Sequence, residues 1–347
     1  MAAQCPARQK NERCAIIVSM STRRGGAPPR ASGKGCEIAP AKIIWDARLL
    51  VRSGRCALCS SGEAVQVGGR QDGLALFECR ECALCFVDPR PSTQQLQDYY
   101  DVGYFSGNKD FFSGENYLEV RDRAIADGSV TGYREITSQL VLSGKNILEI
   151  GCGSGALLQA LKPHGPAGMV GIDLAPYPID YGRKRYSLDL RCCRLGEASF
   201  EKGTFDLVVM IDLVEHVENL PSFLREIGRV LRPGGEVFLL TPNYNAYTVA
   251  RSFWPCLYKD FEHLQYFSPT SLHRAANEMG LALERWWTQG EPLKLSPYPC
   301  QLPQGLHRFR YPAVSFSNLA KKLLFRIRAF GRPDSNYDLC ALLKKKV

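Results

Sequence analysis

Apolar residues after about Gly144 come in short runs, and these runs alternate with longer stretches in which apolar residues recur at helical spacing. Such alternation is typical of buried parallel strands joined by crossover helices. The pattern predicts strands at Asn146–Ile150, Met169–Asp173, Phe205–Met210, Glu236–Thr241, Leu283–Gln289 and Tyr337–Leu343. It predicts helices at Ala156–Leu161, Ile179–Tyr186, Leu220–Leu231 and Pro269–Met279. We therefore expect residues 144–347 to form an α/β domain around a mostly parallel sheet.

The first 143 residues lack this alternation and divide into three parts. Residues 1–50 are rich in Arg, Gly, Ala, Pro and Ser without periodicity. We expect a disordered basic tail there, because such a composition buries too little apolar surface to offset the ordering entropy. Residues 51–92 are rich in turn-forming residues and contain paired cysteines. Residues 93–143 show helical spacing with interleaved aromatic side chains, which predicts a helical lead-in that covers an active site.

The net charge of +9 is concentrated at the two ends of the chain. Residues 1–55 and 289–347 each contain eleven Lys or Arg and three acidic residues, so residues 56–288 carry a net charge of −7. An acidic centre argues against a nucleic-acid groove, whereas the basic ends are either solvated or meet anionic groups. No segment approaches the roughly 20 apolar residues of a membrane-spanning helix, and no secretory signal is visible. We expect a cytoplasmic protein.

A glycine-rich turn follows the first predicted strand of the α/β domain. Its sequence runs Glu149-Ile-Gly151-Cys152-Gly153-Ser-Gly155, and glycine is required where the backbone bends sharply and approaches a ligand closely. The next strand ends at Asp173, where a carboxylate can accept both hydroxyl groups of a ribose. These features fit an adenosine cofactor, but dinucleotide-dependent enzymes share them.

Further motifs follow in a fixed order at close spacing. They are Gly196-Glu197, Thr204-Phe-Asp206, Val214-Glu215-His216-Val217, Leu231-Arg-Pro233-Gly234-Gly235 and Pro242-Asn243. With the glycine-rich turn, this series resembles the class I S-adenosylmethionine-dependent methyltransferases of the group that contains the ubiquinone O-methyltransferase. The resemblance covers about residues 146–289 and implies a Rossmann-like sheet with an antiparallel last strand and helices on both faces.

The resemblance also implies a binding site for S-adenosyl-L-methionine. Glu149 and the turn at Gly151, Cys152 and Gly153 would hold the methionine end of this cofactor. Asp173 would hold its ribose, and Leu174 is a further candidate for cofactor binding. Glu197 stands where the family usually has Asp near the adenine amine, and Ile211 would cover the adenine ring. We interpret Asp206 as a locally bonded strand residue, and Pro233-Gly234-Gly235 as a turn before the next strand.

Methyl transfer from a sulfonium requires alignment of the acceptor, the methyl group and the sulfur in a dry pocket. A hydroxyl acceptor also needs a base that removes its proton, and His263 and His216 are the candidates near the ends of the sheet. For each histidine the alternative is an imidazole that serves only the structure.

The pairs Cys56-x-x-Cys59 and Cys79-x-x-Cys82 are separated by 19 residues, a spacing that brings four thiolates around one tetrahedral Zn²⁺. The following sequence, Phe86 to Pro91, resembles a zinc-ribbon leader found before some methyltransferases of this group. Ser60 and Ala83 stand where the family often has glycine. A closed four-thiolate site leaves no position for a substrate, so this Zn²⁺ is expected to be structural.

The methyl acceptor is not apparent from the sequence, and neither is the oligomeric state. A small-molecule, lipid-linked or sugar acceptor methylated on oxygen is the favoured interpretation. The alternatives are a nucleic-acid-binding zinc protein with a degenerate methyltransferase fold, and a nicotinamide-dependent oxidoreductase. Residues 313–331 predict a basic amphipathic helix, in which Leu319, Leu323 and Ile327 share one face. Through 318–330 this helix would either cover the catalytic domain or contact an anionic membrane.

Overall fold

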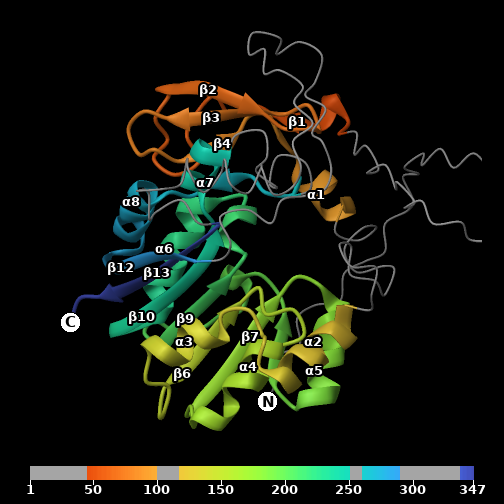
Figure 1. Cartoon of the computed structure of the whole chain (residues 1–347), viewed down its shortest axis with the longest axis vertical. Helices are drawn as coiled ribbons and strands as arrows, with labels where there is room; N and C mark the ends of the chain where they lie inside the picture. The colour runs from red at the N-terminus through yellow and green to blue at the C-terminus, as the bar shows by residue number, and fades with distance from the viewer. Residues whose placement is uncertain (1–44, 100–116, 251–259, 290–336) are drawn as a thin grey trace, which may run out of the picture. The chain divides into compact units, whose positions relative to one another are not determined.

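The computed structural model describes residues 45–99, 117–250, 260–289 and 337–347 (Figure 1). The predicted basic tail therefore lies almost entirely outside the described residues, and the predicted amphipathic helix at 313–331 lies wholly outside them. Within the described ranges, no helix is long and apolar enough to cross a membrane.

A seven-stranded sheet forms the centre of the larger domain (Figure 1). Its strands, in spatial order, are β12 (Leu281–Gln289), β13 (Asp338–Lys345), β10 (Leu231–Pro242), β9 (Phe205–Ile211), β6 (Asn146–Ile150), β7 (Gly168–Asp173) and β8 (Asp189–Cys192). Strands β6 to β10 pair in parallel, whereas β13 runs antiparallel to both of its neighbours. The predicted mostly parallel sheet with an antiparallel last strand is confirmed.

Alternate residues of the central strands belong to two different apolar cores, as the period of two in a strand requires. On one face, Ile147 packs with helices α3 (Tyr133–Gln139), α4 (Ala156–Leu161) and α5 (Pro176–Tyr186). On the other face, Leu148 belongs to the core of α6 (Leu220–Val230) and α8 (Pro269–Met279), which also includes apolar residues of the cysteine-containing module. Both faces are covered, which explains the nearly continuous apolar runs in the sequence.

Side chains fix where several of these helices begin. Asn219 accepts a hydrogen bond from the Ser222 backbone N–H at the start of α6, and Ser268 with Ser271 forms a capping box at the start of α8. Each helix has proline at its first positions, where the missing N–H costs nothing. The boundaries predicted for α4 and α8 are confirmed to the residue.

Two predictions about the central strands were incomplete. Strand β8 was not predicted, because its sequence is short and half polar. The segment Pro233-Gly234-Gly235 was expected to be a turn, but it lies within β10, where the pairing with β9 shifts register between Leu231 and Glu236. The positive φ of Gly234, 73°, accommodates this irregularity without ending the strand.

The cysteine-containing module is built around a second sheet with the strand order β11-β4-β3-β2. Strands β2 (Ala64–Gly69), β3 (Ala75–Cys79) and β4 (Cys85–Val87) belong to the module, whereas β11 (Gln265–Tyr266) comes from the segment just before α8. A pair of short strands, β1 (Leu50–Val51) and β5 (Arg90–Pro91), flanks this sheet, and α1 (Thr93–Tyr99) follows it. The module and the larger domain thus share one sheet.

Candidate active site

A cavity of about 970 Å³ lies at the carboxyl ends of β6, β7 and β9. Its walls come from the glycine-rich turn after β6, the end of β7, and the segments that follow β8 and β9. Residues of α1 and of α2 (Tyr117–Asp127) also line it. Ligands bind at this edge of open α/β sheets, because the loops after neighbouring parallel strands converge there. Two helices of the predicted lead-in therefore contribute to the wall of this cavity.

The glycines of the turn are required by its backbone. Gly151, Gly153 and Gly155 have φ values of 78°, 52° and 75°, in the left-handed region. A Cβ atom on Gly153 would lie 2.7 Å from the Tyr117 hydroxyl oxygen, and one on Gly151 would lie 2.9 Å from a Leu213 methyl carbon. The turn thus places backbone atoms that no side chain covers at the cavity. Cys152, which stands between the two glycines in the sequence, also lines the cavity.

Glu149 is a buried carboxyl in the wall of this cavity, with 5% of its surface exposed. Its Oε2 atom has no hydrogen-bond partner among the described residues. Burial, and secondarily the charge of Asp173, raises the pKa of Glu149 to about 8. A buried, unpaired carboxyl facing a cavity is suited to receive a cationic group, which would restore its ionised form.

Asp173 lies at the end of β7 and accepts two backbone hydrogen bonds. Its Oδ2 accepts from the Gly153 N–H and its Oδ1 from the Ala175 N–H, both at 2.8 Å. Burial raises the pKa of this carboxyl, against the effect of the backbone donors. Each oxygen keeps a further lone pair, so the carboxylate can still accept from a pair of hydroxyl groups. Leu174 and Ile211 also line the cavity, and their contact with a cofactor stays a prediction.

Glu197 lies beside the cavity but not in its lining. Its carboxylate accepts from the Arg194 backbone N–H at 2.9 Å, which closes the 3₁₀ turn η4 (Leu195–Glu197). Arg194, Leu195 and Gly196 are the lining residues of this turn. The expected contact of Glu197 with an adenine amine stays a prediction, since the observed role of this side chain is local capping.

Tyr117 and Arg121 of α2 line the cavity and were missed as site residues. The Arg121 guanidinium lies over the Tyr117 ring, 5.0 Å from its centroid. In the sequence, Tyr117 was one of several aromatic residues with the spacing of a helix core. The signal available in the sequence was the separation of Tyr117 and Arg121 by four residues, which places both side chains on one helix face.

His216 and His263 lie against each other, with ring centroids 4.6 Å apart and planes inclined at 82°. His216 ends the short turn η5 (Val214–His216) and lines the cavity, whereas His263 is not among the lining residues. Burial lowers the pKa of His216 to about 4, so its imidazole is neutral at pH 7.

Glu215 lies beside the two histidines. Its Oε2 accepts from the Thr241 hydroxyl at 2.8 Å, and its Oε1 lies 4.0 Å from His216 Nε2. Burial, followed by the charge of Asp212, raises the pKa of Glu215 well above its usual value. One ligand atom each from Glu215, His216 and His263 lies within 4.8 Å of the others, a grouping that is also compatible with a divalent cation.

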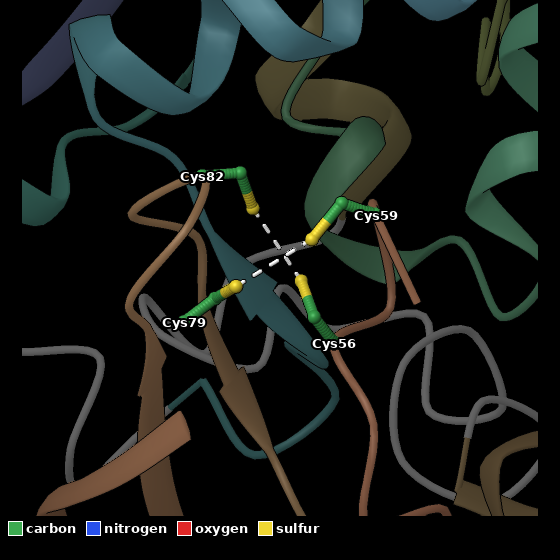
Figure 2. A group of neighbouring side chains, drawn as sticks. All are labelled: Cys56, Cys59, Cys79 and Cys82. Carbon is green, nitrogen blue, oxygen red and sulfur yellow. Dashed lines mark hydrogen bonds between the residues drawn. The ribbon is translucent and has the colours of Figure 1, made fainter. Parts of the chain in front are cut away.

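The four predicted cysteines converge on one point (Figure 2). The Sγ atoms of Cys56 and Cys82 are 3.5 Å apart, as are those of Cys59 and Cys79, and all four lie within 4.8 Å of one another. Zinc–sulfur bonds of about 2.3 Å in a tetrahedron require sulfur separations of roughly 3.8 Å. The arrangement therefore fits one Zn²⁺. Cys85 is buried in β4 and does not belong to the group.

Two tight turns bring the cysteine pairs together. The N–H of Ser60 donates to the Cys56 carbonyl and the N–H of Ala83 to the Cys79 carbonyl, both at 3.0 Å. Ser60 and Ala83 have φ values of 60° and 58°, the left-handed conformation that glycine adopts most easily. Two residues with a Cβ atom thus adopt the backbone conformation of the glycines that the family often has at these positions.

In a comparison with known proteins, a family model described as a methyltransferase domain matches residues 127–285. The chain is 29% identical over 160 residues to the ubiquinone biosynthesis O-methyltransferase of Coxiella burnetii, a match that covers 43% of this chain and 68% of that protein. It is 36% identical over 110 residues to the ubiquinone biosynthesis O-methyltransferase of Pseudomonas aeruginosa, covering 30% of this chain and 47% of that protein.

Solved structures with a similar chain path include an S-adenosylmethionine-dependent methyltransferase from Archaeoglobus fulgidus. It has 18% sequence identity and a TM-score of 0.46, and the match covers 65% of this chain and 94% of that one. Geranyl diphosphate C-methyltransferase from Streptomyces coelicolor has 16% identity and a TM-score of 0.45, covering 67% and 87%. The matched family range contains Glu149, Asp173, His216 and His263, and it excludes the four cysteines.

Proposed function

We propose that this chain is a class I S-adenosylmethionine-dependent methyltransferase that methylates a hydroxyl oxygen of a small-molecule acceptor. The match of residues 127–285 to a methyltransferase-domain model supports this proposal. The observation that supports oxygen as the methylated atom is the neutral imidazole of His216 in the cavity wall. An unprotonated imidazole can accept the proton that an attacking hydroxyl must lose, although burial makes this imidazole a weaker base than a free histidine. The names of the curated relatives, which are O-methyltransferases, point in the same direction.

The cavity offers groups that complement each part of S-adenosylmethionine. Glu149 would accept from the amino group of the methionine part, and Arg121 would meet its carboxylate. Asp173 would accept from the ribose hydroxyls. Leu174, Leu195 and Ile211 would contact the adenine ring with apolar surface. Because Glu149, Asp173 and the glycine turn are intact and line one cavity, a degenerate fold that only binds nucleic acid is disfavoured.

When bound, the cofactor supplies a methyl group on a positively charged sulfur. In the proposed reaction the acceptor oxygen forms a bond to the methyl carbon while the carbon–sulfur bond breaks, and the electron pair of that bond neutralises the sulfur. His216 accepts the hydroxyl proton as the oxygen attacks. Glu215 Oε1 lies 4.0 Å from His216 Nε2, and in its ionised form, reached by releasing its own proton to solvent, this carboxylate would stabilise the resulting imidazolium.

We further propose that Cys56, Cys59, Cys79 and Cys82 hold one structural Zn²⁺. The support is the convergence of four sulfur atoms at separations suited to a tetrahedral ion. All four positions around such an ion would be occupied by protein sulfur, so it would stabilise the module and take no part in the chemistry.

The test has two stages. Calorimetry should first show binding of S-adenosylhomocysteine with a dissociation constant in the roughly micromolar range of ordinary cofactor sites. Transfer of a labelled methyl group is then measured with catechol, methyl glucoside and an aliphatic amine as probe acceptors. We expect label on a hydroxyl acceptor, and His216→Gln should lower that rate by roughly 100-fold, as loss of a general base does.

His164 is the matched control histidine, since it contacts Tyr133 and is not among the cavity-lining residues. His164→Gln should therefore leave the transfer rate unchanged. Absence of S-adenosylhomocysteine binding to the intact protein would refute the methyltransferase proposal. Transfer to the amine alone would refute only the assignment to oxygen.

A further inference from the structure

The segment 260–267, called here the acceptor segment, carries His263 and is attached to the cysteine module by backbone pairing. In the sheet of the module, Gln265 of β11 pairs with Phe86 of β4, and Tyr266 pairs with Cys85. The Val87 N–H donates to the Leu264 carbonyl at 2.9 Å. Every residue of this segment is buried.

Arg70, at the end of the module's β2–β3 hairpin, holds the same segment through its guanidinium. Its Nη2 donates to the Phe261 carbonyl at 2.9 Å, and its Nη1 donates to the His263 carbonyl at 2.6 Å and to the Tyr266 hydroxyl at 3.3 Å. The carbonyls that it binds stand two residues apart and bracket Glu262. These contacts fix the path of the backbone that presents the His263 ring.

A buried ion pair orients this guanidinium. Arg70 has 1% of its surface exposed, and its Nε and Nη2 donate to Asp72 at 3.2 and 2.5 Å. The Trp45 indole N–H donates to the same carboxylate at 2.7 Å. A fully buried arginine is costly unless its charge is paired and its N–H groups are satisfied, and here both conditions are met. Asp72 thus orients the guanidinium from within the module, while the remaining N–H groups bind the acceptor segment.

The opposite side of the acceptor segment is bonded to the turn that carries His216. The Leu264 N–H donates to the Glu215 carbonyl at 2.8 Å. The Gln265 side-chain amide donates to the carbonyls of Val214 and Val217, at 2.7 and 2.9 Å. The acceptor segment is thus held between the cysteine module on one side and η5 on the other, which sets the His216–His263 ring contact.

We propose that Arg70 is a positioning residue for methyl transfer, through which the cysteine module sets the His216–His263 pair at the cavity. It acts on the backbone on either side of Glu262 and touches no reacting atom. The inference rests on the proposed function for the role of His216. It assigns the module a second role besides its own stability, which is to hold the backbone segment whose His263 ring contacts the proton-accepting imidazole.

The test removes the guanidinium without leaving a buried charge behind. Arg70→Met alone would strand the Asp72 carboxylate and could unfold the module, so the main variant is Arg70→Met with Asp72→Asn, in which the asparagine oxygen still accepts from Trp45. Arg70→Lys keeps the charge but offers three donors in place of five. The matched control is Arg183→Met, which removes an arginine that binds the Leu190 carbonyl at 2.6 Å and pairs with Asp180.

Three measurements are made on the full chain. In the double variant, amide hydrogen exchange in 260–267 should accelerate by roughly tenfold or more, while exchange in β6 and α4 stays unchanged. Wild-type protein with labelled histidine should show a nuclear Overhauser contact between the His216 and His263 rings, and the double variant should lose this contact. With catechol as acceptor, kcat should fall by roughly tenfold, while the dissociation constant of S-adenosylhomocysteine changes by less than about twofold.

Arg70→Lys should restore part of the ring contact and of kcat, and Arg183→Met should change none of the three readouts. A folded double variant with unchanged exchange in 260–267 and an intact histidine contact would overturn the inference. If wild-type protein binds no S-adenosylhomocysteine, the proposed function fails, but exchange and the histidine contact still decide whether Arg70 positions the segment.

Discussion

The two sides of the active-site cavity are assembled in different ways. On the cofactor side, Glu149, the glycine turn and Asp173 come from two consecutive strand–helix units and lie within 25 residues of sequence. On the acceptor side, His216 depends on a segment held by Arg70, and the residues joined by the Arg70–His263 hydrogen bond are 193 positions apart. The cofactor side is thus built from residues close in sequence, whereas the acceptor side depends on contacts between residues far apart in sequence.

The difference indicates which parts of the protein can vary independently. A local cofactor site can be formed by the sheet alone, because the carboxyl ends of adjacent parallel strands always meet at one edge. An acceptor site that is held by a separate module can change its substrate when the module changes, or when the segment that the module holds changes. The following predictions separate the two sides by perturbing one and measuring the other.

The largest effect is expected from Cys79→Ser, which removes one of four thiolates from the module. Loss of a structural metal ligand should lower the free energy of unfolding by about 4 kcal/mol or more, measured by denaturant titration. Zinc content should fall below one per chain, while the affinity for S-adenosylhomocysteine changes far less than stability. Cys85→Ser, in the same module but outside the cysteine group, should retain the metal. Folded Cys79→Ser protein with a full complement of zinc would contradict this assignment.

The second effect concerns the pH dependence of cofactor binding through Glu149. Its pKa in the free protein is about 8, so the carboxyl is mostly protonated at pH 7. A cationic amino group favours the ionised form, so binding should release a proton, and affinity should rise with pH until about pH 8 and then level off. The slope should approach a factor of about 10 per pH unit on the acidic side, about 1.4 kcal/mol.

Calorimetry of S-adenosylhomocysteine binding in buffers with different ionisation enthalpies measures this proton release directly. Glu149→Gln should bind more weakly and release almost no proton. A wild-type affinity that is flat between about pH 6 and pH 8 would mean that Glu149 does not meet the amino group.

A third effect is expected from Asp173→Ala, which removes the acceptor for the ribose hydroxyls. Affinity for S-adenosylhomocysteine should fall by about 2 kcal/mol, because hydrogen bonds to a charged group are lost. Asp189→Ala, at an exposed carboxylate paired with Arg191, is the matched control and should have no effect. Hydrogen exchange in 260–267 should stay as in wild type. If Asp173→Ala also loosens that segment, the two sides are not independent.

The smallest effect is a gain in stability from Ala83→Gly. Ala83 has a φ of 58°, a conformation that costs a residue with a Cβ atom about 1 kcal/mol, and glycine should recover that amount. Thermal unfolding of the zinc-loaded protein provides the measurement. Ala57→Gly, at a position of the first cysteine pair without a positive φ, should destabilise the module instead. Equal effects of the two substitutions would argue against backbone strain as the cause.

Much of the fold was predictable because its signals are local. Apolar residues alternate between two covered faces in each central strand, so their runs marked five of the seven strands of the large sheet nearly in place and a sixth, β10, except for its start. The glycine turn and Asp173 follow directly from strand ends. The cysteine spacing fixes four thiolates in two tight turns, whatever the rest of the chain does. In each case the signal is a local pattern, although the two cysteine pairs meet only in the folded module.

The tertiary structure alone decided the rest. In the sequence, Arg70 looks like any solvated arginine, and only the fold buries it beside Asp72 and the backbone of the acceptor segment. The sequence offered His216 and His263 as two separate candidates, and the contact between their rings accompanies the pairing of β11 with the sheet of the module. Such contacts depend on how distant segments pack, and no local spacing encodes that packing.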